Sequence, residues 1–163
     1  MKAVYVYTFG NYTTWRSKLG ADSEFVIGVF GDSNVLTPLL EVAKKRRIRK
    51  RTIRVEHFDS LDDDLRTARI LLISDRTLPS ERDKIIAKLK NKSTQLVGES
   101  KGFLAAGGHC EFRVEGQSVK FQLSVPAARA SGLSFSAKLL RLSSAPAKST
   151  QEVGVEIQPQ FSQ

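Results

Sequence analysis

Short apolar runs alternate along this chain with segments that carry a helical pattern, and this alternation constrains the fold more than any other feature. The runs lie at residues 25–30, 52–58, 70–74 and 95–98. They are nearly continuous in hydrophobicity or alternate with a period of two, as buried strands do. Helices are expected to begin at Pro38 after a Thr37 cap, at Ser60 with Asp63, and at Ser80 with Asp83. Strands joined by helices pair in parallel, so we predict one α/β domain with a mostly parallel sheet and helices on both faces.

The C-terminal half adds a predicted antiparallel β-hairpin. Residues 110–114 and 119–123 each alternate apolar with polar side chains, and a Gly116-centred turn joins them. Before the hairpin, Gly107-Gly108 is expected to form a corner that needs positive φ or close backbone approach. After it, Pro126 opens a short helix that stops at Gly132. Ser134 or Ser136 then caps a last helix.

The N-terminal segment 3–15 carries two conflicting patterns. Its β-branched and aromatic residues alternate, which favours a strand. Tyr5, Phe9 and Tyr12 also fall at positions i, i+4 and i+7, which is one face of a helix. The residues alone leave both alternatives open.

Ordered pieces of the sequence resemble the YfiR-like family of bacterial proteins. They are KAVYVYTFGNYTTW, EFVIGVFGD, KRTIRV and ARILLISD, followed by GF-x3-GG, FRVEGQSVKFQLS, AARASGL and SAKLLRLS, so the resemblance spans about residues 2–143. It implies an N-terminal helix that ends at Trp15, which we adopt over the strand. Its extent sets an expected YfiR-like domain at residues 1–143. After Ser143 the composition changes to Ser, Ala, Pro, Lys and Gln, which predicts a flexible or extended tail at residues 144–163, with Val153–Ile157 as a segment able to pair with an exposed sheet edge.

The resemblance also implies a function. The type member of the family is a periplasmic protein that represses a membrane-bound diguanylate cyclase by binding its periplasmic region, and so lowers cyclic-di-GMP. By resemblance we expect a non-enzymatic regulator without a cofactor, which binds a membrane-bound diguanylate cyclase or sensor kinase and forms a homodimer. The candidate partner surface comprises Tyr5, Phe9, Tyr12, Trp15, Phe103, Gly107 and Gly108.

The formal charge of +9 predicts attraction to polyanions. Much of the excess lies in one run, which we take as a candidate anion-binding patch: Lys44, Lys45, Arg46, Arg47, Arg49, Lys50 and Arg51. The alternative is a solvated helix end and turn, where cations complement the helix dipole. No aromatic residue is interleaved in the run, which argues against base stacking and hence against nucleic acid.

Residues suited to catalysis or metal binding are sparse. The two histidines, His57 and His109, fall short of a zinc site, and His109 and Cys110 point to opposite faces of their predicted strand. The lone Cys110 is expected to be a buried thiol, where the family can carry disulfides. The acidic residues 62–64 are explained by helix capping. We therefore predict no catalytic and no metal site.

Two alternative functions and two locations stay open. A small-ligand sensor module would need an enclosed apolar pocket at the carboxyl ends of the strands. A cytoplasmic nucleic-acid-binding protein would use the basic run. The sequence shows no secretory signal and no apolar run long enough to span a membrane. The resemblance favours the periplasm with the signal peptide absent, and the cytoplasm applies if Met1 is the native start.

Overall fold

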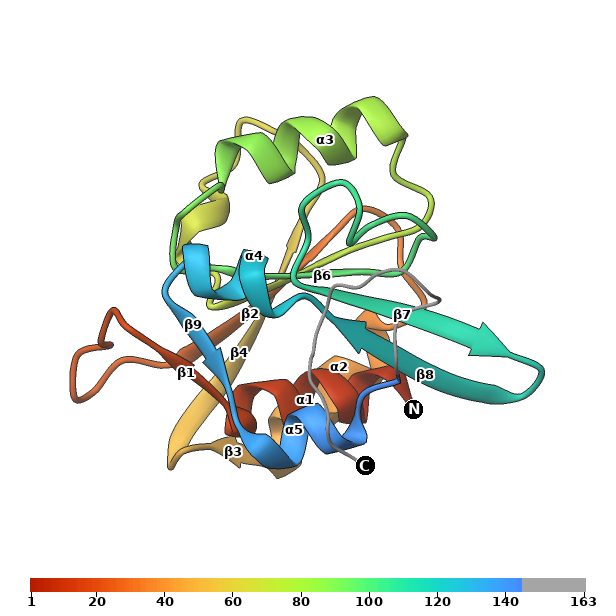
Figure 1. Cartoon of the computed structure of the whole chain (residues 1–163). Coiled ribbons are helices and arrows are strands. Elements are labelled where there is room, and N and C mark those ends of the chain that lie inside the picture. Colours follow the sequence, from red (N-terminus) through yellow and green to blue (C-terminus); the bar gives the residue numbers. More distant parts are fainter. Residues whose placement is uncertain (145–163) are drawn as a thin grey trace.

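A seven-stranded sheet forms the centre of the computed structural model, which describes residues 1–144 (Figure 1). Its strand order is β3-β4-β2-β5-β6-β7-β8. The strands are β2 (Phe25–Phe30), β3 (Arg47–Ile48), β4 (Arg51–Phe58), β5 (Ile70–Ile73), β6 (Gln95–Gly98), β7 (Cys110–Glu115) and β8 (Ser118–Leu123). The five strands from β4 to β7 pair in parallel, and β3 and β8 pair antiparallel at the two edges. The predicted α/β class with a mostly parallel sheet is confirmed.

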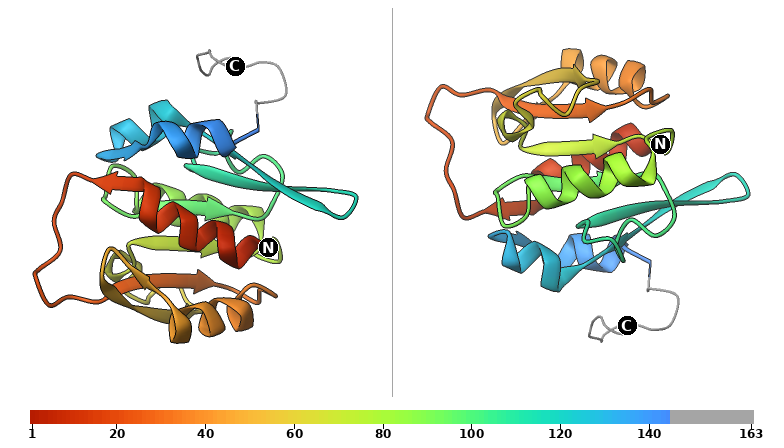
Figure 2. Two further views of the ribbon diagram at one scale, coloured as in Figure 1. Left: turned by 90° about the horizontal axis from the view of Figure 1, so that it is seen from below. Right: turned by 90° about the horizontal axis from the view of Figure 1, so that it is seen from above.

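Helices cover both faces of this sheet. Helices α1 (Lys2–Tyr12), α2 (Leu36–Lys45) and α5 (Ala137–Leu142) lie on one face, and α3 (Pro79–Lys88) lies on the other (Figures 1 and 2). The short 3-10 helix η1 (Leu65–Thr67) precedes β5. A separate two-stranded ribbon of β1 (Thr13–Trp15) and β9 (Leu133–Phe135) joins the two ends of the described chain, with α4 (Val125–Ala130) just before β9.

Two hydrophobic clusters hold the layers together, one on each face of the sheet. In β2 the side chains of Ile27 and Val29 belong to the cluster beneath α1 and α2, and those of Val26 and Phe30 belong to the cluster beneath α3. All six residues of β2 are buried. This double burial explains why the run is continuously apolar: a strand covered on both faces has no solvent-facing side.

The N-terminal segment is helical, as the resemblance implied, because tertiary packing outweighs the local β propensity. Val6 and Phe9 are fully buried, and the Phe9 ring stands edge-on to Phe121 at 5.0 Å between centroids. The helix ends at Tyr12 and not at Trp15. The reason is that Thr13–Trp15 pair with β9 as an extended strand.

Three predicted helix starts need correction. Helix α2 begins at Leu36, and the cap-like contact comes from Ser33, whose Oγ accepts the Val35 N–H at 3.0 Å, and not from Thr37. Helix α3 begins at Pro79, one residue before the predicted Ser80. No α-helix follows Ser60 in the described chain.

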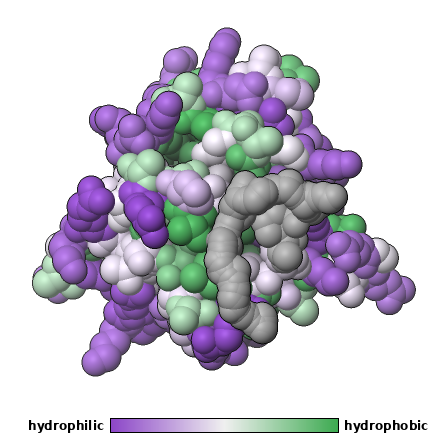
Figure 3. Space-filling model, viewed as in Figure 1, coloured by the Kyte–Doolittle hydropathy of each residue, from purple (hydrophilic) through white to green (hydrophobic). Residues whose placement is uncertain are grey.

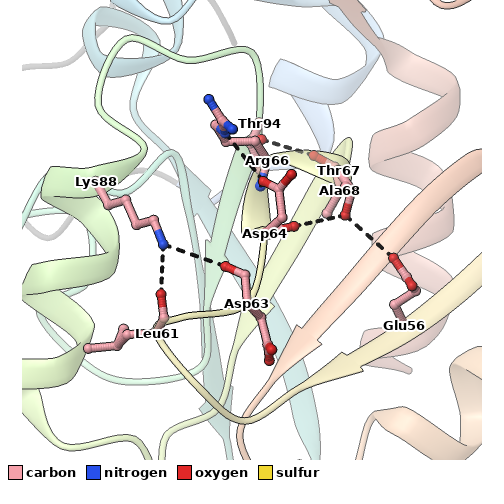
Figure 4. Close-up of polar contacts among 9 residues, drawn as sticks. All are labelled: Glu56, Leu61, Asp63, Asp64, Arg66, Thr67, Ala68, Lys88 and Thr94. Atoms are coloured by element: carbon pink, nitrogen blue, oxygen red, sulfur yellow. Dashed lines mark hydrogen bonds and ion pairs between the residues drawn. The ribbon is translucent and has the colours of Figure 1, made fainter.

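The acidic segment after β4 is a turn, which hydrogen bonds within the segment and from α3 stabilise (Figure 4). Lys88 from the end of α3 donates its Nζ proton to the Leu61 carbonyl at 2.6 Å, and Asp64 caps η1 by accepting the Arg66 N–H. Thr94 donates its hydroxyl proton to the Ala68 carbonyl at 2.9 Å. These contacts use the segment for structure, which is the role that the sequence predicted for residues 62–64, although in a turn rather than a helix.

The Gly107-Gly108 corner forms as predicted and serves the packing of one ring. Gly107 has a φ of +114°, which favours glycine. A Cβ on Gly108 would lie 2.1 Å from Phe103, and one on Gly98 in β6 would meet the same ring at 2.1 Å. The fully buried Phe103 is therefore clamped between two backbones, a close approach that side chains larger than hydrogen would prevent.

Candidate functional site

Most of the residues expected to form a partner surface are part of the core. Phe9 and Phe103 are fully buried, and Trp15 is 6% exposed, edge-on to Phe25 at 5.6 Å. Gly108 is buried as well. Of the predicted set, Tyr5 and Tyr12 are half-buried and Gly107 is exposed. The structure thus brings the aromatics of α1 into one cluster with β7 and β8, where they stabilise the fold and present little surface.

The basic run forms the end of α2 and the β3–β4 hairpin, and several of its members make structural contacts. Arg49 donates to the Thr13 carbonyl at 2.6 Å and the Asn11 carbonyl at 3.3 Å, at the end of α1. Arg51 donates to the Gly20 and Ser23 carbonyls at 2.6 and 2.8 Å, which pins the loop before β2.

Other members of the run stay accessible to solvent. Arg46 lies over the Tyr7 ring, 5.7 Å from its centroid, and Lys44 pairs with Glu41 at 3.3 Å in an exposed contact. Arg47 donates to the Thr52 hydroxyl at 3.4 Å. Lys45 and Lys50 are exposed and make no side-chain contact with the described part of the chain. The patch therefore exists as a surface, but the arginines at 49 and 51 also hold the fold.

A buried polar group links β6, β7 and the end of α4. The Nδ1 atom of His109 accepts the Leu96 N–H at 2.8 Å, so the ring proton sits on Nε2, 3.1 Å from the Ser131 hydroxyl. Burial lowers the pKa of His109 to about 4, against a smaller opposing effect of the Ala127 backbone. At neutral pH the ring is uncharged and structural, not poised for catalysis.

The single cysteine is buried, as predicted. Burial raises the pKa of the Cys110 thiol to about 12, although the Gln95 amide, which donates to Sγ at 3.1 Å, opposes this. A thiol of this kind is unreactive at neutral pH. Within residues 1–144 no three histidine, cysteine, aspartate or glutamate side chains are placed to hold a metal ion.

A polar cleft of about 460 Å³ lies at the carboxyl ends of β2, β5 and β6. Lys2 donates to Glu99 at 2.8 Å, Ser33 donates to the other Glu99 oxygen at 2.7 Å, and Arg76 pairs with Asp32 at 2.7 Å. These side chains at the cleft are therefore paired with one another. The cleft differs from the enclosed apolar pocket that a small-ligand sensor would need, because ion pairs line it.

A second groove, of about 380 Å³, lies between α4, β9 and α5. In Figure 3 an apolar patch with hydrophilic side chains around it is visible in this region. The apolar side chains that line it are Val125, Ala128, Leu133, Phe135 and Leu140. Thr14 and Ser134, paired across β1 and β9, add two small polar groups.

The local sequence explains why the groove stays open. Ser124 caps α4 by accepting the Ala127 N–H at 3.3 Å, and the helix ends before Gly132, whose φ of +77° turns the chain into β9. Ser136 then caps α5 by accepting the Leu139 N–H at 3.1 Å. The two short helices α4 and α5 therefore flank the three-residue strand β9. Neither helix is long enough to cover the other.

Two arginines line the groove together with these apolar groups. Arg16 follows β1 and lies along Gly132, where a Cβ would come within 3.3 Å of it. Arg129 lies in the last turn of α4. Both are exposed, and neither side chain has a carboxylate partner or a hydrogen bond within the described residues. Apolar groups beside unpaired cations are suited to a partner segment that combines aliphatic or aromatic side chains with carboxylates.

These features define a single α/β domain with an open groove between α4, β9 and α5. The chain belongs to the YfiR/HmsC-like family, whose model matches residues 1–144. This is a family of regulatory, non-catalytic domains. A comparison with curated proteins finds no match. No helix in residues 1–144 has the length and apolar character needed to cross a bilayer.

Sequence reasoning missed the groove. Five of its lining residues lie in the pieces AARASGL and SAKLLRLS, which carried the family resemblance; Val125, Ser134 and Phe135 lie beside these pieces, and Thr14 and Arg16 lie near the other end of the chain. The antiparallel pairing of Thr13–Trp15 with Leu133–Phe135 brings them together. The sequence signal was weak: a three-residue strand has no periodicity to detect.

Proposed function

We propose that this protein is a periplasmic regulator that binds the periplasmic region of a membrane signalling protein, such as a diguanylate cyclase, and thereby controls cyclic-di-GMP output. Membership of a regulatory family supports the class of function. The periplasmic location, the cyclase and the direction of control are parts of the proposal. The groove between α4, β9 and α5 supports the mode of action, namely binding to another protein. Its two exposed arginines, Arg16 and Arg129, have no carboxylate partner within the described residues.

The groove between α4, β9 and α5 is the observation on which this proposal depends. Leu140 is 41% exposed there, and Phe135 is half-buried. Filling the groove would remove this apolar surface from water, which favours association by about 25 cal/mol per Å² buried. Arg16 and Arg129 would then pair with partner carboxylates at the rim, which adds specificity and speeds encounter more than it adds affinity.

Binding of this kind regulates a partner by selecting one of its conformations. A protein that binds an inactive conformation more tightly than the active one shifts the equilibrium by its difference in affinity for the two states. The regulator itself needs no chemistry. This suits a chain whose histidine and cysteine side chains at 109 and 110 are buried and bonded internally.

The test uses the membrane diguanylate cyclases of the same organism, each taken as its purified periplasmic region. Each region is titrated with the full chain, native or carrying Arg129→Glu, in isothermal titration calorimetry. We expect the native chain to bind one of them and the charge reversal to weaken binding at least tenfold, because it replaces attraction by like-charge repulsion at the rim. Cyclic-di-GMP measured in cells that express the same variants is expected to rise when binding is lost.

A matched control separates the groove from general charge effects. Lys84→Glu makes the same change of charge on α3, across the sheet from α5, at an exposed lysine without a side-chain partner in the described chain. It is expected to leave binding unchanged. Equal weakening by both variants, or no binding by the native chain, would contradict the proposal.

The accessible members of the first predicted surface extend this proposal. Tyr5, Tyr12 and Gly107 remain candidates for secondary contacts with a partner or with a second copy of the chain. A homodimer is expected from the family resemblance. Light scattering of the purified full chain over a range of concentrations measures it directly, and a mass equal to one chain at all concentrations would contradict it.

A further inference from the structure

The segments that form one helical layer and the adjoining β3 are strongly basic. Helices α1, α2 and α5 lie side by side in one layer, and Figure 2 (left) looks directly onto them. The β3–β4 hairpin lies beside them at the same end of the molecule in Figure 1. Residues 2–12, 36–50 and 137–142, which form this layer and β3, contain nine lysines and arginines and one glutamate. Their net charge of +8 compares with +9 for the whole chain.

The same layer carries exposed aliphatic side chains. Val4 on α1 is 52% exposed, Leu40 on α2 is 42% exposed and Leu142 on α5 is 51% exposed. The helical pattern after Pro38 predicts that Leu40 points inward, and the structure corrects this. On α1 the buried positions are Ala3, Val6 and Phe9, which places Val4 on the opposite, outward side of the helix.

Several of the cations in this layer are free to bind a ligand. Lys45, Lys50 and Arg141 are exposed and have no side-chain hydrogen bond or ion pair within residues 1–144. The single acidic side chain, Glu41, pairs with Lys44 in a contact in which both groups stay more than half exposed. Apart from Lys44, and from Lys2, which pairs with Glu99, the cations of the layer have no carboxylate partner within residues 1–144.

We propose that this cationic helical face, formed by α1, α2, α5 and the β3–β4 hairpin, docks on the surface of an anionic lipid bilayer. Basic side chains bind anionic headgroups, and exposed aliphatic side chains enter the boundary between headgroups and acyl chains. The combination distinguishes a bilayer from a soluble polyanion, which offers charge but no apolar phase.

The aromatic side chains of the face argue against nucleic acid as the occupant. Stacking on single-stranded bases needs open aromatic rings. Tyr7 lies beneath Arg46 and Tyr12 lies beneath Lys138, with the cations 5.7 and 5.0 Å from the ring centroids. Tyr5 packs edge-on against Phe121 at 4.9 Å. The exposed apolar groups that remain are aliphatic, which suits lipid.

Docking in this orientation would leave the groove of the proposed function accessible. Figure 1 looks onto α4 and β9, with the helical layer along the lower edge of the molecule. A protein lying on this layer would hold the groove at the side, close to the membrane surface, where the periplasmic region of a membrane protein begins. The inference goes beyond the proposed function, and its test does not depend on any protein partner.

The test is sedimentation of the full chain with vesicles. Equimolar phosphatidylglycerol and phosphatidylcholine is compared with phosphatidylcholine alone, at low salt and at about 0.15 M salt. We expect binding to the anionic vesicles, weakened by salt, and none to the neutral ones. The combined variant Lys45→Gln, Lys50→Gln and Arg141→Gln should bind about a hundredfold more weakly, because each cation near the surface contributes about fivefold.

Two further variants separate this face from charge in general. Replacing Lys84, Lys90 and Lys92 by Gln lowers the net charge equally on and just after α3, across the sheet, and should leave vesicle binding nearly unchanged. The double variant Leu40→Gln and Leu142→Gln should weaken binding about tenfold through lost apolar contact. Circular dichroism checks that every variant is folded.

Three results would overturn the proposal: no binding to anionic vesicles at low salt, equal loss in the two lysine-containing triple variants, or binding to duplex DNA without binding to vesicles. The proposed function fails separately, because Arg129→Glu changes a groove residue outside α1, α2 and α5. That variant should keep vesicle binding while losing the cyclase.

Discussion

The buried His109 predicts a specific pH dependence of stability. Its pKa in the folded chain is lowered from 6.5 to about 4. Between pH 4 and pH 6.5 the unfolded chain therefore binds a proton at His109 that the folded chain does not bind. The contribution is fully present above pH 6.5 and is lost as the pH falls toward 4. At about 1.4 kcal/mol for each pH unit, the loss attributable to this one residue approaches about 3 kcal/mol.

The structure explains why protonation is resisted. Nδ1 accepts the Leu96 N–H at 2.8 Å, and a proton added there would turn this hydrogen bond into a clash of two donors. His109→Asn tests the reasoning because the Asn side-chain oxygen can accept the same N–H and has no proton to gain near pH 5. At pH 7 the variant should be about 1–2 kcal/mol less stable, since the contact with Ser131 is lost.

Urea unfolding between pH 7 and pH 4.5, followed by the fluorescence of the single, buried Trp15, measures the effect. The native chain should lose roughly 2–3 kcal/mol more than His109→Asn over this range. His57→Asn is the control: His57 is exposed on β4, and its removal should leave the pH profile of the native chain unchanged. Parallel profiles for the native chain and His109→Asn would refute the account.

Three further predictions concern packing, backbone and thiol chemistry. Gly108→Ala should destabilise the protein by at least about 2 kcal/mol, because its Cβ would lie 2.1 Å from Phe103. Thermal unfolding compares it with Gly116→Ala, where nothing lies within 4 Å and the φ of +61° alone should cost about 1 kcal/mol. Equal losses in the two variants would contradict the clash with Phe103. Lys50→Gly should raise the free energy of unfolding by up to about 1 kcal/mol, because Lys50 has a φ of +69° in the two-residue turn between β3 and β4. Urea unfolding measures the change, and no gain would argue against backbone strain at this position. Cys110 should resist a thiol reagent at pH 7.5 until urea unfolds the chain, because burial raises its pKa to about 12; labelling of the native protein at the rate of a free thiol would contradict this.

The layered α/β class was predictable because each strand is either apolar throughout or alternates. Phe25–Phe30 is buried on both faces of the sheet and reads as a continuous apolar run. The short helix starts were harder. Ser60 and Asp63 have the spacing of a capping box, and they do contact each other, Asp63 Oδ2 accepting the Ser60 N–H at 3.3 Å. The chain there forms a turn, because local capping alone does not commit a segment to a helix.

Several residues of the predicted partner surface are buried, for a related physical reason. Aromatic residues at helical spacing show the same sequence pattern whether they contact a partner protein or the sheet of their own domain. In α1, Phe9 packs against Phe112 and Phe121 of the sheet. The groove depends on residues about 120 positions apart, paired through β1 and β9. The cationic run was visible in the sequence, but the use of Arg49 and Arg51 as backbone tethers required the tertiary structure. The predicted strand-like segment Val153–Ile157 lies outside the described residues.

The central claim is that this protein acts by binding a membrane signalling partner through the groove between α4, β9 and α5. The most direct measurement is the affinity of the full chain for the periplasmic region of a membrane diguanylate cyclase from the same organism, compared between Arg129→Glu and Lys84→Glu. The account predicts a loss of at least tenfold for the first variant and none for the second. Binding that is unchanged by Arg129→Glu would show that the partner contacts another surface.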